Sequence, residues 1–472
     1  MTRIFLLAIL LLGSVGCSMR SLPLKPQQPL AFQELESFSK KDTVLVLAPH
    51  PDDEAIACAG IIQKALSAGA KVYVVYLTNG DHNQVAFIVY EKRLTIKKGE
   101  FLHMGKVRKL EAVKAMKLLG VPEENLIFLG YPDIGTFAIF RQYWQTDRPY
   151  RSLLTRVTKV PYKDDLSFAA PYVGESILSD VKNVLLRYKP NKIFVSHPAD
   201  TNGDHKAGYL FLQIALRDLR ADIPAPAVYP YLVHCVGWPL PRHYHPELNL
   251  APPKKFAQSG MSWFQATLSQ AELEKKHQAI LCYKSQTESS AFYLLSFARR
   301  NELLSDLPEI SLKRQVSVSG REPEFSGFSA LFRDTLETVF EEGRTIEDDT
   351  SVSEGRAGFA IVDNNLVVRI EKNKEVHSRL RFILYLFGYN NRLAFSKMPK
   401  LRIIVKNEKF KIFDGPKIIR PEGVVLEASP DRVTIRIPLS VLGGPDFVLA
   451  SVRAYGGMVP VDATAFRRLT IQ

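Results

Sequence analysis

One short polar stretch carries side chains that could hold a metal ion and move a proton. His50 and Asp53 lie three residues apart, close enough for both to face a single ion. Asp52 lies between them, and if Asp53 is directed at the metal, the Asp52 carboxylate points elsewhere and is free to accept a proton. Imidazole and carboxylate are ligand types that zinc accepts. The alternative is an acidic helix start, because Asp and Glu are favoured in the first helical turn.

A second polar stretch, much later in the chain, supplies a third candidate ligand. It comprises residues 200–205, with the sequence DTNGDH, and it ends at His205. Together with His50 and Asp53, His205 would complete a set of two histidines and one carboxylate that leaves a position for water. Such a set is typical of catalytic rather than structural zinc sites.

Both stretches follow an apolar run and precede a helical pattern. The same alternation continues from residue 43 to residue 234. Expected strands are residues 44–48, 72–77, 126–129, 193–196 and 228–233, and expected helices lie near residues 55–68, 107–119, 175–188 and 205–218. This pattern predicts an α/β fold with a Rossmann-like, mainly parallel sheet and helices on both faces. Both polar stretches then lie at the carboxyl ends of strands, where open α/β sheets place their sites.

Six segments resemble, in the same order, motifs of the PIG-L/LmbE-like zinc-dependent N-acetylglucosaminyl deacetylases. They are residues 48–54 (APHPDDE), 77–81 (LTNGD), 108–112 (RKLEA) with 119–121 (LGV), 128–133 (FLGYPD), 200–205 (DTNGDH) and 283–286 (YKSQ). One such motif is a weak signal, but six in order are a strong one. The resemblance covers about residues 43–290 and assigns a deacetylase domain to residues 41–300.

The resemblance implies a hydrolase that cleaves a linear amide C–N bond. Zinc on His50, Asp53 and His205 would activate a water, and Asp52 would act as general base. The expected substrate is an N-acetylglucosamine-type sugar in a glycan or glycoconjugate. The sequence does not choose between a cell-wall fragment, a surface polysaccharide and a glycolipid.

The resemblance also assigns substrate-binding residues. Arg108 and Asp133 match family positions that contact the sugar, and we expect the same role for both. The alternatives are a solvated helix charge for Arg108 and an ordinary turn residue for Asp133. An aromatic insertion at residues 134–172 would either line the substrate rim or anchor a long loop.

The chain departs from the family beside the third ligand. Many members have a histidine two residues before the Asp-His pair, where this chain has Asn202, and Gly203 stands where proline is common. Asn202 could donate a hydrogen bond to the oxyanion but carries no proton to give, which puts that electrostatic role in doubt. Asp204 is a candidate orienter of the neighbouring His205.

The N-terminus has the pattern of a bacterial lipoprotein signal peptide. Residues 1–17 contain Arg3, an apolar run at 4–12 and small residues before Cys17. Ser14 is a departure, since a lipobox usually has an aliphatic residue there, and an ordinary cleaved signal is the alternative. Residues 18–40 then form a tether. We expect a protein of the cell envelope, periplasmic or facing the outer membrane, anchored to the membrane through a lipidated Cys17.

Residues 311–472 have a different pattern of short strands and Gly/Pro turns. Expected strands are residues 366–370, 382–387, 401–406, 424–428, 433–437 and 447–454. They predict a C-terminal antiparallel β-sandwich. The region faintly resembles family 9-type carbohydrate-binding and DOMON-like sandwiches, and a structural or docking domain is the alternative.

The net charge bears on the kinds of partner that the protein could bind. A formal charge of +13 suits residence near anionic lipid or polysaccharide, although a generally basic surface explains it equally. No nucleic-acid motif is present, so we expect no nucleic-acid partner. Two other functions stay open: a surface glycan-binding lipoprotein with weak or no deacetylase activity, and a zinc amidase for another N-acyl substrate.

Overall fold

Strand β2 (Thr43–Ala48) lies at the centre of the fold, between β3 (Lys71–Thr78) and β5 (Lys192–Ser196). It runs parallel to both neighbours. Alternate β2 side chains enter cores on opposite faces of the sheet, with Val46 in one and Leu47 in the other. A strand covered on both faces needs an apolar residue at every buried position, which explains the unbroken apolar run of β2.

The chain is seen here in a computed structural model. The structure describes residues 32–82, 89–90, 97–256, 261–330, 332–333, 355–372, 380–406, 408–456 and 459–472. The predicted signal peptide, Cys17 and the first part of the tether lie outside these residues. Phe32–Gln472 form one unit. None of the helices described in it has both the length and the hydropathy to cross a membrane.

The central sheet has the strand order β1-β7-β8-β6-β5-β2-β3-β4. The strands not yet given are β1 (Gln33–Glu34), β4 (Leu126–Tyr131), β6 (Ala227–Tyr231), β7 (Ser262–Thr267) and β8 (Asn301–Asp306). The five strands from β6 to β4 are all parallel, while β8 is antiparallel to β6 and β7. The predicted Rossmann-like sheet is therefore confirmed, and β7 and β8 extend it beyond the predicted strands.

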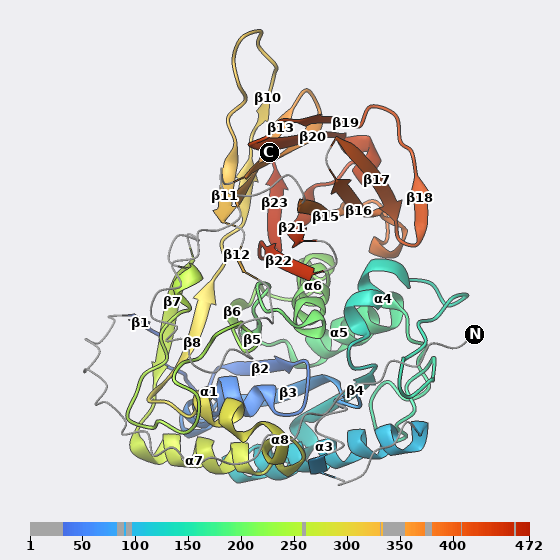
Figure 1. The fold of residues 1–472 in the computed structure, drawn as a ribbon. Coiled ribbons are helices and arrows are strands. Elements are labelled where there is room, and N and C mark those ends of the chain that lie inside the picture. Colours follow the sequence, from blue (N-terminus) through green and yellow to red (C-terminus); the bar gives the residue numbers. More distant parts are fainter. Residues whose placement is uncertain are drawn as a thin grey trace, which may run out of the picture. The chain divides into compact units, whose positions relative to one another are not determined.

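Helices cover both faces of this sheet (Figure 1). Helices α1 (Asp53–Ser67), α3 (Lys98–Leu119), α7 (Gln270–Leu281) and α8 (Lys284–Leu294) contribute to one core, and α4 (Thr136–Gln142), α5 (Gly174–Tyr188) and α6 (Gly203–Asp218) to the other. Helix α3 begins well before the helix predicted near residues 107–119. Lys97 occupies its N-cap position and is not a residue type that marks a helix start.

The C-terminal region is a β-sandwich with a six-stranded and a nine-stranded sheet. The first contains β10 (Arg314–Gln315), β11 (Ser326–Ala330), β13 (Gly355–Val362), β14 (Asn365–Lys372), β19 (Val425–Ala428) and β20 (Arg432–Pro438); the second contains β9 (Ile310–Leu312), β12 (Phe332–Arg333), β15 (Leu380–Tyr389), β16 (Lys400–Lys406), β17 (Lys409–Asp414), β18 (Lys417–Ile419), β21 (Phe447–Gly456), β22 (Val459–Ala463) and β23 (Arg467–Ile471). Residues of both sheets share one core, among them Val368 and Leu384. The pairings are antiparallel except β9 with β23 and β10 with β13, so the predicted antiparallel region is confirmed.

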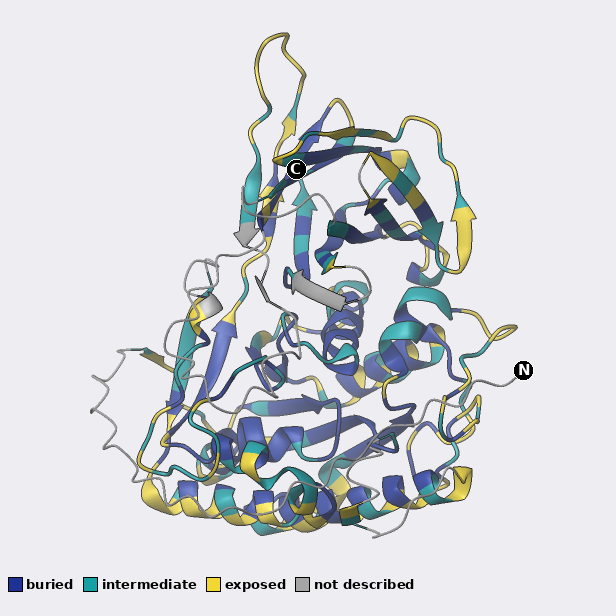
Figure 2. Ribbon diagram, in the orientation of Figure 1, coloured by how far each residue is buried: buried dark blue, intermediate teal, exposed yellow. Residues whose placement is uncertain are grey.

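The aromatic insertion joins the α/β sheet region to the sandwich. Phe140 of α4 is fully buried, and its ring centroid lies 5.2 Å from that of Phe387 in β15. Phe137 packs edge-on to Phe466 at 5.9 Å. Figure 2 shows α4 as buried or intermediate along its length. These rings therefore anchor the insertion, which was one of its two predicted uses.

Candidate active site

The turn between β2 and α1 carries His50, Asp52 and Asp53. Asp53 Oδ2 accepts a hydrogen bond from the His50 backbone N–H at 2.9 Å and lies 3.2 Å from His50 Nδ1. Asp52 occupies the N-cap position of α1, but its side chain makes no capping hydrogen bond. Its φ of 130° lies outside the regions that residues other than glycine prefer, and such strain is common at functional sites. Capping of the helix is therefore not the role of the Asp52 side chain.

Helix α6 follows the turn after β5 and carries His205, which is fully buried, in its first turn. The side-chain oxygen of Asn202 accepts a hydrogen bond from the Asp204 backbone N–H at 2.8 Å and so caps α6. This cap fixes the first turn of the helix, where His205 lies. His205 Nε2 is 3.1 Å from Asp53 Oδ2 and 3.3 Å from His50 Nδ1.

Three donor atoms of these two turns thus converge, and all three are ligand types for a divalent metal. Their mutual separations of 3.1–3.3 Å agree with the edge of a tetrahedron, about 3.3 Å, around an ion with bonds of about 2.0–2.1 Å. The residues present therefore fit a metal ion bound by His50, Asp53 and His205. All three were predicted as ligands from the sequence.

Each histidine of this set has a carboxylate at its other ring nitrogen. His50 Nε2 lies 3.2 Å from Asp133 Oδ1, and His205 Nδ1 lies 3.1 Å from Asp200 Oδ2. A carboxylate in that position fixes the ring orientation and the tautomer of a metal-ligating histidine. Asp204 Oδ2 also lies 3.4 Å from His50 Nε2. Asp133 and Asp204 therefore hold His50 Nδ1 toward Asp53, and Asp200 does the same for His205 Nε2.

The carboxylates also set the protonation of the two imidazoles. Burial lowers the pKa of His205, but Asp200 and Asp53 outweigh it and raise that pKa to about 9. Burial likewise lowers the pKa of His50, and Asp133 then contributes most to raising it well above its usual range. A metal ion would have to replace these protons, so metal affinity should fall as the pH falls.

Arg108 of α3 holds Asp52 in its uncapped position. Its Nη2 donates to Asp52 Oδ2 at 3.1 Å and to the Pro51 carbonyl at 2.7 Å, and its Nη1 donates to the Gly80 carbonyl at 3.1 Å. A Cβ at position 80 would lie 2.0 Å from Arg108 Nη1, so this approach requires glycine. Burial raises the pKa of Asp52 to about 7, and the charge of Arg108 works against that rise.

Residues 45–216 match the family model PIG-L: GlcNAc-PI de-N-acetylase. This stretch contains both metal-site turns and Arg108. The chain carries a PIG-L family domain. A comparison with curated proteins found no significant match.

Solved structures similar to this chain include two deacetylases and a hydratase. N,N′-diacetylchitobiose deacetylase from Pyrococcus horikoshii is 18% identical, with a TM-score of 0.32, over 52% of this chain and 70% of that one. A deacetylase from the teicoplanin biosynthesis pathway is 16% identical, with a TM-score of 0.33, over 52% and 85%. The 4-carboxy-2-hydroxymuconate hydratase GalB from Pseudomonas putida is 16% identical, with a TM-score of 0.35, over 60% and 100%.

Tyr283 and Ser285, from the YKSQ segment, lie beyond residue 216 but pack against the PIG-L domain. The Tyr283 hydroxyl donates to Glu54 Oε1, and the Ser285 backbone N–H donates to Glu111 Oε1 at 2.8 Å. Ser285 Oγ adds a bond to Glu111 Oε2 at 2.6 Å. The segment around α8 therefore secures α1 and α3, which position Asp52 and Arg108.

Asp204 lies beside His50 rather than beside His205, with its Oδ2 3.4 Å from His50 Nε2, and Asn202 lies at the start of α6. Asp204 Oδ1 accepts from the Thr136 backbone N–H at 2.9 Å, and its Oδ2 accepts from the Ile134 backbone N–H. Asp204 thus ties the start of α4 to α6, and Asp200, not Asp204, faces His205 Nδ1. The Asn202 side-chain oxygen is engaged in capping α6. Their catalytic roles stay predictions.

His234, which is partly buried and follows β6, lies beside the metal-site residues. Its ring is perpendicular to that of His205, with 4.6 Å between centroids, and it belongs with His50, Asp53 and His205 to one group of possible ligands. Burial lowers the pKa of His234 to about 4, so its imidazole is neutral near pH 7.

Proposed function

We propose that this protein is a zinc-dependent deacetylase that removes the N-acetyl group from an N-acetylglucosamine-type sugar in a glycan or glycoconjugate. The single observation that carries the proposal is the convergence of His50 Nδ1, Asp53 Oδ2 and His205 Nε2 within 3.3 Å. The PIG-L match over residues 45–216 supports deacetylation as the reaction class.

The residues around this set have separate tasks in the reaction. When bound by His50, Asp53 and His205, zinc would polarise the amide carbonyl and acidify water. Asp52 takes a proton from the attacking water, whose oxygen forms a bond to the carbonyl carbon. Asp52 then gives that proton to the amide nitrogen as the C–N bond breaks. The products are acetate and the free amine of the sugar.

The position of Asp52 suits a general base. Arg108 holds its carboxylate at 3.1 Å, and burial sets its pKa at about 7. A base with a pKa near the operating pH combines the ionised form with a useful affinity for the proton. Asp52 makes no capping bond to α1, so the carboxylate is not committed to the helix.

The proposal extends to the location of the protein. We infer that Cys17 is lipidated and anchors the mature chain in the cell envelope, as the apolar run at residues 4–12 and the small residues before Cys17 suggest. Metabolic labelling with a fatty acid tests this inference. Label on the wild type and none on Cys17→Ser would support it, and equal labelling would contradict it.

Amine release tests the activity itself. The metal-loaded protein would be incubated with chitin oligosaccharides, with de-acetylated oligosaccharides and with N-propionyl analogues. Amine release that is fastest from the chitin oligosaccharides, abolished by a chelator and restored by zinc, is the expected result. Release of a different acyl group at a higher rate would instead favour a zinc amidase for another N-acyl substrate.

A further inference from the structure

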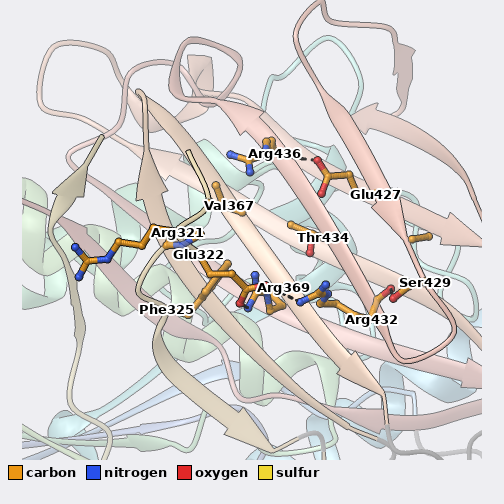
Figure 3. A pocket seen from close by; sticks show the side chains of 13 residues that line it. Arg321, Glu322, Phe325, Val367, Arg369, Glu427, Ser429, Arg432, Thr434 and Arg436 are labelled. Carbon is orange, nitrogen blue, oxygen red and sulfur yellow. Dashed lines mark hydrogen bonds and ion pairs between the residues drawn. The ribbon is translucent and has the colours of Figure 1, made fainter. Parts of the chain in front are cut away.

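The sandwich has a polar pocket on the outer face of its six-stranded sheet (Figure 3). Side chains alternate between the two faces of a strand. Ile370 of β14 and Ile435 of β20 point into the sandwich core, whereas Arg369 and Thr434 line the pocket on the other face. The pocket has a volume of about 390 Å³, which is within the range of small-molecule sites.

Arginines from adjacent strands form the floor and rim of this pocket. Arg369 on β14 pairs directly with Thr434 on β20. Arg432 and Arg436 lie two residues before and after Thr434, so all three residues of β20 face the same side. Arg321 joins them from the loop before β11. In Figure 3, Arg369, Arg432 and Arg436 project from the sheet on the same side, whereas the Arg321 side chain extends away from them.

The acidic residues of the pocket do not use up the guanidinium donors. Glu322 accepts one bond from Arg369 Nη1 and one from Arg432 Nη1, both at 3.0 Å. Each guanidinium offers five N–H donors. Within the described part of the chain, Arg369 Nε is buried without a hydrogen-bond partner. Three arginines, Arg369, Arg432 and Arg436, lie beside two glutamates, Glu322 and Glu427, so this part of the lining carries a net charge of about +1. Glu427 Oε1 lies 3.9 Å from Arg436 Nε.

One arginine is rigid and two are accessible. The Arg369 guanidinium lies 4.0 Å from the Phe325 ring centroid, and its side chain is only 12% exposed. The side chains of Arg432 and Arg436 are 42% and 34% exposed. A preorganised arginine at the base and reachable arginines at the rim suit an anionic ligand that enters from solvent.

The loop that carries Phe325 is fixed by its own hydrogen bonds. The Gln315 side-chain amide donates to the Glu324 carbonyl at 2.7 Å and accepts from the Glu324 backbone N–H at 2.8 Å. These bonds hold the loop without Glu322. The Glu322 pairs to Arg369 and Arg432 are therefore not the only attachment of this loop to the sheet.

We propose that this pocket binds a carboxylate-bearing sugar unit of an acidic glycan. A guanidinium binds a carboxylate in bidentate fashion, and Glu427 can accept hydrogen bonds from sugar hydroxyls. The pocket is roomier than a phosphate ion requires, and its two glutamates disfavour a more highly charged group. The site lies on the sandwich, so this inference can be tested independently of the deacetylase proposal.

Calorimetry on the full chain tests this binding, with galacturonic acid trisaccharide as the probe and galactose trisaccharide as its neutral counterpart. Arg432→Gln and Arg436→Gln should each weaken binding of the galacturonic acid trisaccharide about tenfold. The loss of one charge-assisted hydrogen bond has an effect of about this size. Arg420→Gln, an exposed residue of the same domain outside the pocket, should leave the affinity unchanged. Binding should also weaken with salt and persist after chelator treatment.

Glu322→Gln separates a binding role from a structural one. It removes a competing carboxylate, so we expect acid binding at least as tight as in the wild type. If the Arg–Glu pairs only support the loop, Glu322→Gln and Arg432→Gln should lower the thermal midpoint alike and affect binding alike, which would overturn the proposal. Equal binding of the neutral trisaccharide, no binding of either, or equally effective competition by inorganic phosphate would overturn it too.

Discussion

Arg108 Nη2 lies 3.1 Å from Asp52 Oδ2 and 2.7 Å from the carbonyl oxygen of Pro51. One guanidinium nitrogen therefore fixes both the carboxylate and the backbone of the turn before α1. Arg108 is only 3% exposed. This geometry makes it a positioning residue for Asp52, and its sugar contact stays a prediction.

Replacing Arg108 separates these two roles. If Arg108 positions Asp52, Arg108→Gln should lower kcat about 100-fold, the usual effect of misplacing a reacting group by about 1 Å. KM and bound metal should change little. Lys109→Gln, on the same helix, is the matched control because Lys109 pairs with Asp165 instead. A raised KM with unchanged kcat would show that Arg108 binds the sugar and would contradict the positioning role.

Asp200 should set metal affinity through His205. Asp200→Asn removes the charge beside His205 Nδ1 and should weaken metal binding about 10–100-fold. Metal-buffer titration measures the effect. Asp180→Asn is the control, since Asp180 accepts a bond from the Tyr131 hydroxyl. Equal affinities in the two variants would rule out an orienting role for Asp200.

The activity should depend on pH through Asp52. Burial raises the pKa of Asp52 to about 7 in the metal-free chain, and a bound cation would lower it. The base must be ionised, so kcat/KM should fall as the pH drops through a midpoint at or below about 7. Metal content measured at each pH separates this loss from metal release. An acid limb with its midpoint well above 7 would contradict the assignment.

The aromatic contact between α4 and the sandwich should stabilise both regions together. Phe140 is fully buried against Phe387 and Phe211, so Phe140→Ala should cost about 3–5 kcal/mol of unfolding free energy. Hydrogen exchange should show β2 and β15 losing protection in one transition. Phe168→Ala, at a half-exposed side chain, should cost far less. Separate transitions for the two strands would contradict a shared core.

The three metal ligands could be predicted from the sequence because each lies in a polar stretch that follows an apolar run. Strand ends of a parallel sheet meet at one edge, so the order of apolar runs and polar turns is enough to bring His50, Asp53 and His205 together. The function of Asp52 could not be decided in this way. Its choice between a helix cap and a proton acceptor depends on Arg108, which lies 56 positions away.

The orienting carboxylates required the structure for a similar reason. Asp133 and Asp200 act through particular ring nitrogens of His50 and His205, and the orientation of a ring leaves no trace in sequence spacing. Asp204 was expected beside His205 as its neighbour in the chain. On a helix, however, consecutive side chains point in different directions, and Asp204 reaches the start of α4 and His50 Nε2 instead of His205.

The most direct test pairs bound metal with amine release from an N-acetylglucosamine oligosaccharide, for the wild type and Asp52→Asn. Both proteins should hold about one metal ion per chain, because Asp52 is outside the ligand set. The wild type should release amine, and the variant should be at least about 100-fold slower. A variant that keeps both its metal and the wild-type rate would contradict the role of Asp52. A wild type that releases amine without bound metal would contradict the metal site itself.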